Sequence, residues 1–576
     1  MKPKAKTTST GSVQACQNCK NSFTIEPEDF VFYEKMKVPP PTWCPECRFQ
    51  RRLSFFNLTT LHRRKCDLCK KEFVSEYRPD YPYAVYCPPC WWSDKWDAYQ
   101  YGRDYNFSKT FFKQLGELLR DVPRLGLELE YNTCINSSYN NHAGDLKNCY
   151  LIFQADSDED CTYGVIIKNC RLLVDCSACQ QSESCYDSMH LYKTSRGIGH
   201  RSQVVETLDS AFLRDSFNCQ YCFASANLRN KKYYIFNKPY TKEEYFDEIK
   251  KWNLGSYKTY QEVKHLAEGH WKKYPPKPSK DEFSSNSSGS HYFESKNCKN
   301  CFEVTGVEDS KYLFMLAMPP IKDCYDLSAW GDNVFMMYEG CGNGGEAAYL
   351  RFCYNAGLGM YDAEYTTRSF GGSHLFGSVG VRNGQYVIFN KRYSKEDHET
   401  LREKIVRHMD EMPYTDNLGR VYRYGEFFPP ELSPFPYNDT VAQRFFSLTR
   451  EDAEKHGFAW HDTEESEHII TKKADDLPDH IKDAPDSILQ EVIECAECGK
   501  GFKIIPAELE FLRKMNVPLP RCCPFCRIDE KFSQWVRNLR MIERICDKCG
   551  VSFTTNYSKE EAPHILCKKC YQEEVV

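Results

Sequence analysis

Lys147-Asn-Cys-Tyr-Leu-Ile-Phe153 returns further along the chain as Lys168-Asn-Cys-Arg-Leu-Leu-Val174. Around this repeat, seven cysteines are separated by multiples of three residues: Cys134, Cys149, Cys161, Cys170, Cys176, Cys179 and Cys185. Six-residue steps from Cys149 meet small or apolar side chains, namely Ala155, Cys161, Ile167, Leu173, Cys179, Cys185 and Leu191. Such a row is typical of the inward side of a coiled β-solenoid, so we predict one here, in which the interval from Lys147 to Lys168 is about one coil.

The second half of the chain repeats this character less regularly. Asn297-Cys-Lys-Asn-Cys-Phe302, Asp323-Cys-Tyr-Asp326 and Cys353-Tyr354 resemble the first repeat, but Gly-rich insertions interrupt the three-residue phase. We therefore expect a looser or shorter solenoid there. An ordinary sandwich of short strands is the competing interpretation of both halves.

Each half ends in a duplicated segment that leads into a helical pattern. Ile235-Phe-Asn-Lys-Pro-Tyr-Thr-Lys-Glu matches Ile388-Phe-Asn-Lys-Arg-Tyr-Ser-Lys-Glu. Thr241 with Glu244, and Ser394 with Asp397, have the spacing of a capping box, which satisfies the free amides of a first helical turn. We predict that a helix follows each solenoid segment.

A second duplication joins the two ends of the chain. Cys16 to Arg48 aligns without a gap on Cys495 to Arg527, and 15 of these 33 positions are identical. Each copy continues into two further C-x-x-C pairs, and the intervals between pairs are the same in both copies. One ancestral module has therefore been copied.

These pairs are typical of closed zinc sites, because two C-x-x-C turns can place four thiolates around one ion. We expect about four structural Zn²⁺ ions per chain. Redox chemistry or an iron–sulfur cluster is the alternative, but the ribbon-like separations favour zinc. The predicted ligands, site by site, are Cys16, Cys19, Cys44 and Cys47; Cys66, Cys69, Cys87 and Cys90; Cys495, Cys498, Cys523 and Cys526; and Cys546, Cys549, Cys567 and Cys570.

Two motifs carry a resemblance to a known family. Cys16-Gln-Asn-Cys-Lys-Asn-Ser-Phe, followed by Pro39-Pro-Pro-Thr-Trp-Cys-Pro-Glu-Cys-Arg48, resembles the probable zinc-ribbon domain of the treble-clef kind. That resemblance implies a zinc knuckle, a hairpin and a second cysteine pair at a helix N-terminus. With Leu228 to Lys238 and Gly425 to Pro434, the whole chain is similar to uncharacterised multi-cysteine bacterial proteins with zinc-ribbon domains at both ends, a similarity that implies no activity.

The resulting fold class is multidomain and mainly β with α: duplicated treble-clef or zinc-ribbon modules flank two Cys/Tyr-rich β-solenoid-like segments with trailing helices. Pro275 to Ser290 and the acidic stretch after His461 contain the residue types of linkers. The predicted segments are 12–100 (double zinc module), 131–274 (first solenoid segment plus helix), 291–460 (second segment plus helix), 461–490 (acidic linker) and 491–576 (double zinc module).

Composition narrows the class of protein. The net charge of -5, from 76 basic and 81 acidic residues, gives no global attraction for nucleic acid or an anionic membrane. The sequence contains neither an apolar run that could span a bilayer nor a signal peptide, so we expect a cytoplasmic protein without a membrane partner. In that compartment, 31 cysteines are metal ligands and buried thiols rather than disulfides. Inner pairs such as Cys176/Cys179, Cys219/Cys222 and Cys298/Cys301 are best explained as fillers of a narrow interior, although a further metal site or a dithiol switch is an alternative.

We expect a zinc-binding scaffold or adaptor that presents its modules to a protein or nucleoprotein partner, and we do not expect an enzyme. One alternative is binding of single-stranded RNA or DNA through a local basic stretch with interleaved aromatic residues. The same cations would also neutralise the thiolate centres, each formally 2-. A second alternative is a β-solenoid enzyme of unknown reaction. The candidate nucleic-acid-binding residues are Arg48, Arg51, Arg52, Arg63, Arg64 and Lys65.

Overall fold

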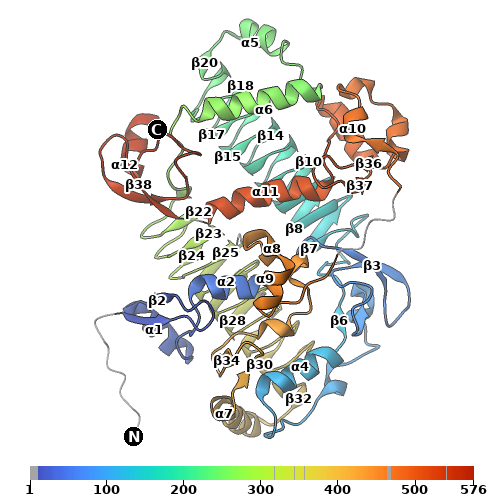
Figure 1. The fold of residues 1–576 in the computed structure, drawn as a ribbon, viewed down its shortest axis with the longest axis vertical. Helices are drawn as coiled ribbons and strands as arrows, with labels where there is room; N and C mark the ends of the chain where they lie inside the picture. Colours follow the sequence, from blue (N-terminus) through green and yellow to red (C-terminus); the bar gives the residue numbers. More distant parts are fainter. Residues whose placement is uncertain (1–10, 317, 343, 356, 463–468, 540) are drawn as a thin grey trace. The chain divides into compact units, whose positions relative to one another are not determined.

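The computed structural model describes residues 11–316, 318–342, 344–355, 357–462, 469–539 and 541–576 (Figure 1). The chain forms two compact units. Unit 1 combines the residues up to Gly126 with Asp281–His461, and unit 2 combines Leu127–Lys280 with Asp462–Val576. The amino-terminal cysteine module therefore packs with the second solenoid segment, and the carboxy-terminal module packs with the first. Among the described residues, no helix has the length and apolar character needed to cross a bilayer.

The predicted β-solenoid is confirmed, and its strands up to Ile235 pair in parallel within unit 2, whereas the final strand, Lys238–Pro239, pairs antiparallel. Arg171 pairs with Glu183, and Glu183 pairs with Ser195, so one coil ends at Ser182 and the next at Thr194. The prediction that one coil spans the interval from Lys147 to Lys168 was wrong, because the observed coil is shorter than this interval. Lys147 and Lys168 are separated by a multiple of three residues, but not by a whole number of coils. The strands are β7 (Asn141–Lys147), β8 (Tyr150–Glu159), β9 (Thr162–Lys168), β10 (Arg171–Val174), β11 (Ser177–Gln180), β12 (Glu183–Tyr186), β13 (Met189–Tyr192), β14 (Ser195–Ile198), β15 (Arg201–Val205), β16 (Leu208–Ala211), β17 (Arg214–Phe217), β18 (Gln220–Phe223), β19 (Lys232–Ile235) and β20 (Lys238–Pro239).

A left-handed residue at every third position bends the chain into these coils. Asp160, Tyr163, Ile166, Asn169, Leu172 and Asp175 all have φ between 53° and 61°. The residue after each of them points inward, and Cys161, Ile167, Cys170 and Leu173 are accordingly buried. This geometry explains why the cysteines are spaced by multiples of three. Because each coil contains few residues, it encloses a narrow interior, which small side chains such as cysteine and serine fill well.

Inward-facing serines and cysteines also satisfy backbone groups at the bends. Ser182 donates its hydroxyl to the Gln180 carbonyl at 2.9 Å and accepts the Thr194 amide, one coil later, at 3.1 Å. The thiol of Cys170 donates to the Lys168 carbonyl at 3.2 Å. The inner pair Cys219/Cys222 behaves in the same way, since the Cys222 thiol donates to the Gln220 carbonyl at 3.5 Å. These thiols therefore act as small, hydrogen-bonded fillers of the interior.

The second solenoid, in unit 1, contains coils of unequal length. Gly289 pairs with Cys301, which is the same interval as in the first solenoid. The interval from Val307 to its partner Ile321 is two positions longer, and that from Val334 to Ala347 is one position longer. These extra residues account for the interrupted three-residue phase in the sequence. The strands are β21 (Asp281–Glu282), β22 (Gly289–Phe293), β23 (Cys301–Thr305), β24 (Val307–Glu308), β25 (Phe314–Leu316), β26 (Met318–Tyr325), β27 (Asp332–Tyr338), β28 (Gly345–Arg351), β29 (Tyr361–Glu364), β30 (Ser373–Phe376), β31 (Gln385–Ile388) and β32 (Lys391–Arg392).

Helices follow both solenoids, as predicted. In unit 2, α5 (Lys242–Ile249) begins with the expected capping box, because Thr241 and Glu244 each bond the other's backbone amide. The longer α6 (Tyr257–Trp271) comes next and runs across the strands of the first solenoid (Figure 1). In unit 1, α7 (Lys395–Glu411) is capped by Ser394, which accepts the Asp397 amide at 3.1 Å. The Asp397 carboxylate bonds the Ser394 hydroxyl at 2.8 Å, so this cap differs from the first.

The predicted acidic linker 461–490 lies partly outside the described residues, at 463–468. Its remaining part contributes apolar side chains to unit 2. Ala474, Leu477, Ile481 and Ile488 are all buried, and short turns of 3-10 helix separate them. This segment is therefore packed along most of its described length.

Asp158 is an acid at an inward-facing position of the first solenoid, with only 2% of its surface exposed. Its carboxylate accepts the Cys170 amide at 2.8 Å and the Asp156 amide at 3.1 Å. Burial raises the pKa of Asp158 from 3.8 to about 7. The folded protein therefore holds this proton more tightly than the unfolded chain does, and the stability it confers at low pH is lost as the pH rises from about 4 through about 7.

We predict that Asp158→Asn removes the loss of stability that wild type shows between pH 4 and pH 8, because the amide cannot ionise. The variant should be less stable than wild type at pH 4, since its one oxygen can accept only one of the two backbone amides that donate to Asp158, and this deficit should shrink by about 2 kcal/mol or more at pH 8. Chemical denaturation at both pH values measures this difference. Asp160→Asn, at a bend facing solvent, is the matched control and should not change the pH dependence; a similar effect of both substitutions would contradict the assignment to Asp158.

Candidate metal centres and their docking helices

Four groups of four cysteines can each hold a metal ion, and they consist of the predicted ligand sets. Within every group the four sulfur atoms lie within 4.8 Å of one another. The Sγ atoms of Cys19 and Cys44 are 3.8 Å apart, and those of Cys549 and Cys567 are also 3.8 Å apart. A tetrahedron with metal–sulfur bonds of about 2.3 Å has edges of about 3.8 Å. The sulfur separations therefore match tetrahedral coordination.

All four centres share one local structure, which is the knuckle, hairpin and helix that the family resemblance implied. A tight turn at the tip of a hairpin carries the first cysteine pair, and the third cysteine is the N-cap of a helix. Lys20 and Lys70 adopt φ of 65°, and Gly499 and Gly550 φ of 71° and 72°, which closes the turn after the first pair. The hairpins are β1 (Ser12–Ala15) with β2 (Ser22–Ile25), β3 (His62–Lys65) with β4 (Glu72–Ser75), β36 (Ile493–Glu494) with β37 (Gly501–Phe502), and β38 (Ile542–Ile545) with β39 (Ser552–Thr555). The helices are α2 (Pro45–Leu53), α3 (Pro88–Trp91), α11 (Pro524–Asn538) and α12 (Lys568–Val575).

Backbone amides favour the thiolate form of the ligands. The amide of the third cysteine donates to the first sulfur in every centre, for example from Cys44 to Cys16 at 3.3 Å and from Cys567 to Cys546 at 3.2 Å. Although burial opposes ionisation, the amides of Cys567 and Cys549 lower the pKa of the Cys546 thiol to about 6. These amides favour the thiolate form of the first cysteine, and four cysteines in this arrangement are a ligand set of structural zinc sites.

The helix after the first centre is bound to the solenoid of unit 1 by buried ion pairs. Arg48, Arg51 and Arg52 on α2 are at most 1% exposed. Arg48 Nε donates to Asp326 Oδ2 at 2.9 Å, and Arg51 Nη2 donates to Glu339 Oε1 at 3.1 Å. Arg52 lies within 3.2 Å of Asp326 and 3.6 Å of Glu339. These three arginines therefore bind carboxylates of their own chain, and their burial corrects the prediction that they face a nucleic acid.

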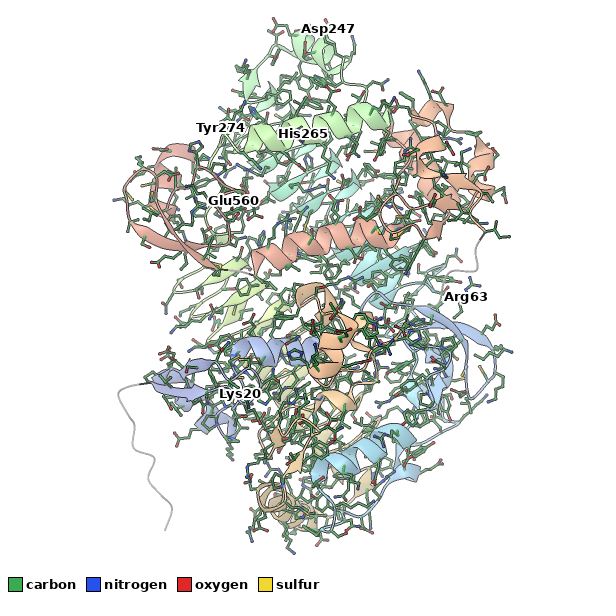
Figure 2. All side chains as sticks on the ribbon, in the orientation of Figure 1. Lys20, Arg63, Asp247, His265, Tyr274 and Glu560 are labelled. Atoms are coloured by element: carbon green, nitrogen blue, oxygen red, sulfur yellow. The ribbon has the colours of Figure 1, made fainter. Side chains whose placement is uncertain are left out.

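The other candidate cations lie on the second hairpin. Arg64 is 8% exposed and forms an ion pair with Asp67 at 3.0 Å, so it too is unsuited to contact nucleic acid. Arg63 and Lys65 are exposed on β3, and Figure 2 labels Arg63 there. Only these two of the six predicted residues have accessible side chains.

Unit 2 repeats the docking contacts of Arg48 and Arg52, but not that of Arg51, which aligns with Glu530. Arg527, which aligns with Arg48, forms ion pairs with Asp175 and, at 3.0 Å, with Glu508. The guanidinium of Arg527 lies 4.6 Å from the Tyr163 ring centre, as that of Arg48 lies 5.6 Å from the Tyr312 ring centre. Four residues later, Lys531 pairs with Asp187, as Arg52 pairs with Glu339. The duplication therefore includes the surface by which each module binds a solenoid.

Asp187 is the centre of the largest of these networks in unit 2. It pairs with Arg201 at 2.9 Å and with Lys264 of α6 at 3.5 Å, and it accepts the Tyr260 hydroxyl at 2.9 Å. Although burial opposes ionisation, Arg201, Lys264 and Lys531 hold the pKa of Asp187 well below its usual value. This carboxylate therefore joins the solenoid to α6 and to α11.

The docking residues were missed at the sequence level, although a signal existed. Arg48 and Arg527 are identical in the aligned modules, and Asp175, Asp187, Asp326 and Glu339 all occupy left-handed positions. Acids in that phase face outward, where a basic helix can bind them.

The comparisons with known proteins add no relative. Neither the protein-family models nor the curated proteins give a match to this chain. The function must therefore be argued from the structure of the sites.

We predict that Arg527→Met destabilises the protein by about 3 to 5 kcal/mol, because it leaves the carboxylates of Asp175 and Glu508 buried without their partner. The double variant Arg527→Met/Asp175→Asn should recover part of this loss. Arg513→Met is the control, since its ion pair with Asp486 is exposed. Equal, small effects of both single variants in chemical denaturation would show that the ion pair does not support docking.

Proposed function

We propose that the protein is a cytoplasmic zinc scaffold whose two modules present their zinc knuckles to a protein or nucleoprotein partner. One observation carries this proposal: the helix that begins at the first centre of each module is the helix that binds a solenoid through buried charges. The first metal centre in each copy would then orient the docking helix, which is a structural role rather than a catalytic one.

Zinc is the metal that this ligand chemistry favours. Four thiolates in a tetrahedron occupy every coordination position, so none is open for water or substrate. Soft thiolate ligands at this geometry select Zn²⁺ or iron, and the separate four-cysteine knuckles favour single zinc ions. About four ions per chain follow from the four clusters.

The knuckles are the parts of the modules that remain accessible for a partner. Cys19, Cys498 and Cys549 are exposed, and each lies on the turn of its hairpin. Lys20, which follows Cys19 and is labelled in Figure 2, is also exposed. Because the helices of the first centres are used for docking, we expect a partner to bind on the hairpin side.

A second candidate function is nucleic-acid binding, now limited to the hairpin of β3 and β4. Arg63, Lys65, Lys70 and Lys71 are exposed there. At the aligned positions of Lys65 and Lys71, the carboxy-terminal hairpin carries Ile545 and Val551, which are 65% and 49% exposed. The basic surface is thus a property of the amino-terminal copy, which favours an anionic partner for that copy.

We predict about four zinc ions per chain by elemental analysis, about three in Cys16→Ser or Cys495→Ser, and about two in the double variant. Each substitution removes one of four thiolates from one centre. Cys219→Ser is the control, because that thiol lies inside the solenoid, and its zinc content should equal wild type. Iron with visible absorbance, or zinc content unaffected by the ligand variants, would refute the zinc proposal.

We predict that Lys65→Ile/Lys71→Val, which copies the carboxy-terminal hairpin, weakens binding to a single-stranded oligonucleotide about tenfold at low salt. Fluorescence anisotropy at several salt concentrations measures the affinity, and the slope against salt should decrease. Lys548→Ala on the other module is the control for a nonspecific charge effect. If wild type does not bind the oligonucleotide even at low salt, the nucleic-acid candidate is wrong and the protein partner remains.

A further inference from the structure

Unit 2 contains a cavity of about 520 Å³ beside its first metal centre. It is lined by α6, by the loop Pro518–Cys522 and by α11, and its walls include Tyr257, Lys264, Arg521 and Cys522. Its volume lies within the range of small-molecule sites, which is about 300 to 1,000 Å³. The scaffold function proposed above assigns no role to this cavity.

The alignment of the modules shows how the cavity arises. Arg521 and Cys522 align with Thr42 and Trp43 of the amino-terminal copy. Trp43 is 2% exposed, and its ring packs 4.1 Å from the Arg51 guanidinium and against Tyr422. An indole therefore fills this position in unit 1, whereas in unit 2 the much smaller thiol of Cys522 borders an open cavity.

Arg521 supplies the second observation, because its charge is buried without a counter-ion. The residue is 8% exposed, and among the described residues it forms no ion pair with a carboxylate. Its Nη2 donates to the carbonyls of Leu477 and Pro478 at 3.0 Å each, but its Nη1 has no hydrogen-bond partner. Arg527, on the same wall, is by contrast paired with two carboxylates. A buried, unpaired guanidinium attracts an anion.

The other wall residues define what such an anion can be. The Arg521 guanidinium lies over the Tyr257 ring, 4.6 Å from its centre. Tyr257 also lines the cavity, where its ring is an apolar wall for a planar group. Lys264 is held by Glu530 at 2.9 Å. The carboxylates of Asp175, Asp187, Glu497, Asp529 and Glu530 line the cavity, together with the cations Lys264, Arg521, Arg527 and Lys531. These carboxylates repel polyanions, so the ligand should carry a single acidic group and little further negative charge.

We propose that this cavity binds a small organic anion through a carboxylate or phosphate group, with Arg521 as its anchor and Tyr257 as a wall for its planar part. The site would be specific to the carboxy-terminal module, since Thr42 and Trp43 replace the anchor and fill the space in the other copy. This inference does not depend on the partner of the zinc modules.

The test is isothermal titration of the full-length, zinc-loaded protein with three probes: benzoate, phenyl phosphate and inorganic phosphate. Binding of benzoate assigns a carboxylate ligand, and binding of either phosphate probe assigns a phosphate ligand. We expect Arg521→Gln to weaken binding by about tenfold or more, because it removes a charge-assisted contact. Arg513→Gln, on α10 (Pro506–Met515), removes an exposed arginine of the same module and should bind as wild type does.

Cys522→Trp keeps Arg521 but fills the cavity with the side chain that the amino-terminal copy carries, and it too should abolish binding. Because that copy folds with tryptophan at this position, this variant decides the matter if Arg521→Gln fails to fold, as judged by zinc content and circular dichroism. The proposal is overturned if none of the three probes binds wild type, or if a folded Arg521→Gln or Cys522→Trp protein binds them as tightly as wild type.

Discussion

The left-handed residue at each bend is the constraint on which both solenoids depend; it occurs at every third position in the first solenoid and less regularly in the second. Most of these residues are not glycine, and an L-residue in this conformation costs roughly 1 kcal/mol. Hydrogen bonds between successive coils offset the cost. Side chains at the bends form ladders as well: Asn136 donates to Asn148 at 3.1 Å, and Asn148 donates to Asp160 at 3.0 Å. Asparagine and aspartate tolerate this conformation better than most residues, which explains their frequency at the bends.

The same bends determine where the cysteine modules pack on the solenoids. Acids at left-handed positions of successive coils, such as Asp175 and Asp187, face outward about 4.8 Å apart, the spacing of neighbouring strands. Residues four apart on a helix are separated by about 6 Å along its axis. A helix that crosses the strands, as α11 does in Figure 1, can therefore place one cation on each coil. Arg527 and Lys531 use this match, and Arg48 and Arg52 use it in unit 1.

The sequence was informative wherever the signal was local. Pairs such as Cys16/Cys19 identified all four cysteine clusters that can hold a metal ion, because the two-residue gap is itself the geometry of a knuckle. The three-residue phase of the cysteines identified the solenoid interior. The coil length was not predictable from that phase, because every side of a coil shares it, and the observed and expected lengths are both multiples of three. The docking pairs could not be predicted from the sequence, because the partners are far apart along the chain. Arg48 and Asp326 are separated by 278 residues, and Arg527 and Asp175 by 352. No local pattern connects such residues.

The two modules differ in sequence mainly at positions outside the cysteine ligands and the contacts with the solenoids. Their ligands agree, and so do two of the docking cations, Arg48 with Arg527 and Arg52 with Lys531, whereas Arg51 corresponds to Glu530. The solvent-facing positions differ: Lys65 and Lys71 in one copy correspond to Ile545 and Val551 in the other. Trp43 is buried in the amino-terminal module, whereas the aligned Cys522 borders an open cavity. One of these differences lies on the exposed hairpin surface, and the other lies at a buried position beside the first cysteine cluster. The duplicated frame therefore keeps its cysteine clusters and two of its docking cations, while the hairpin surface and the space beside the first cluster differ between the copies.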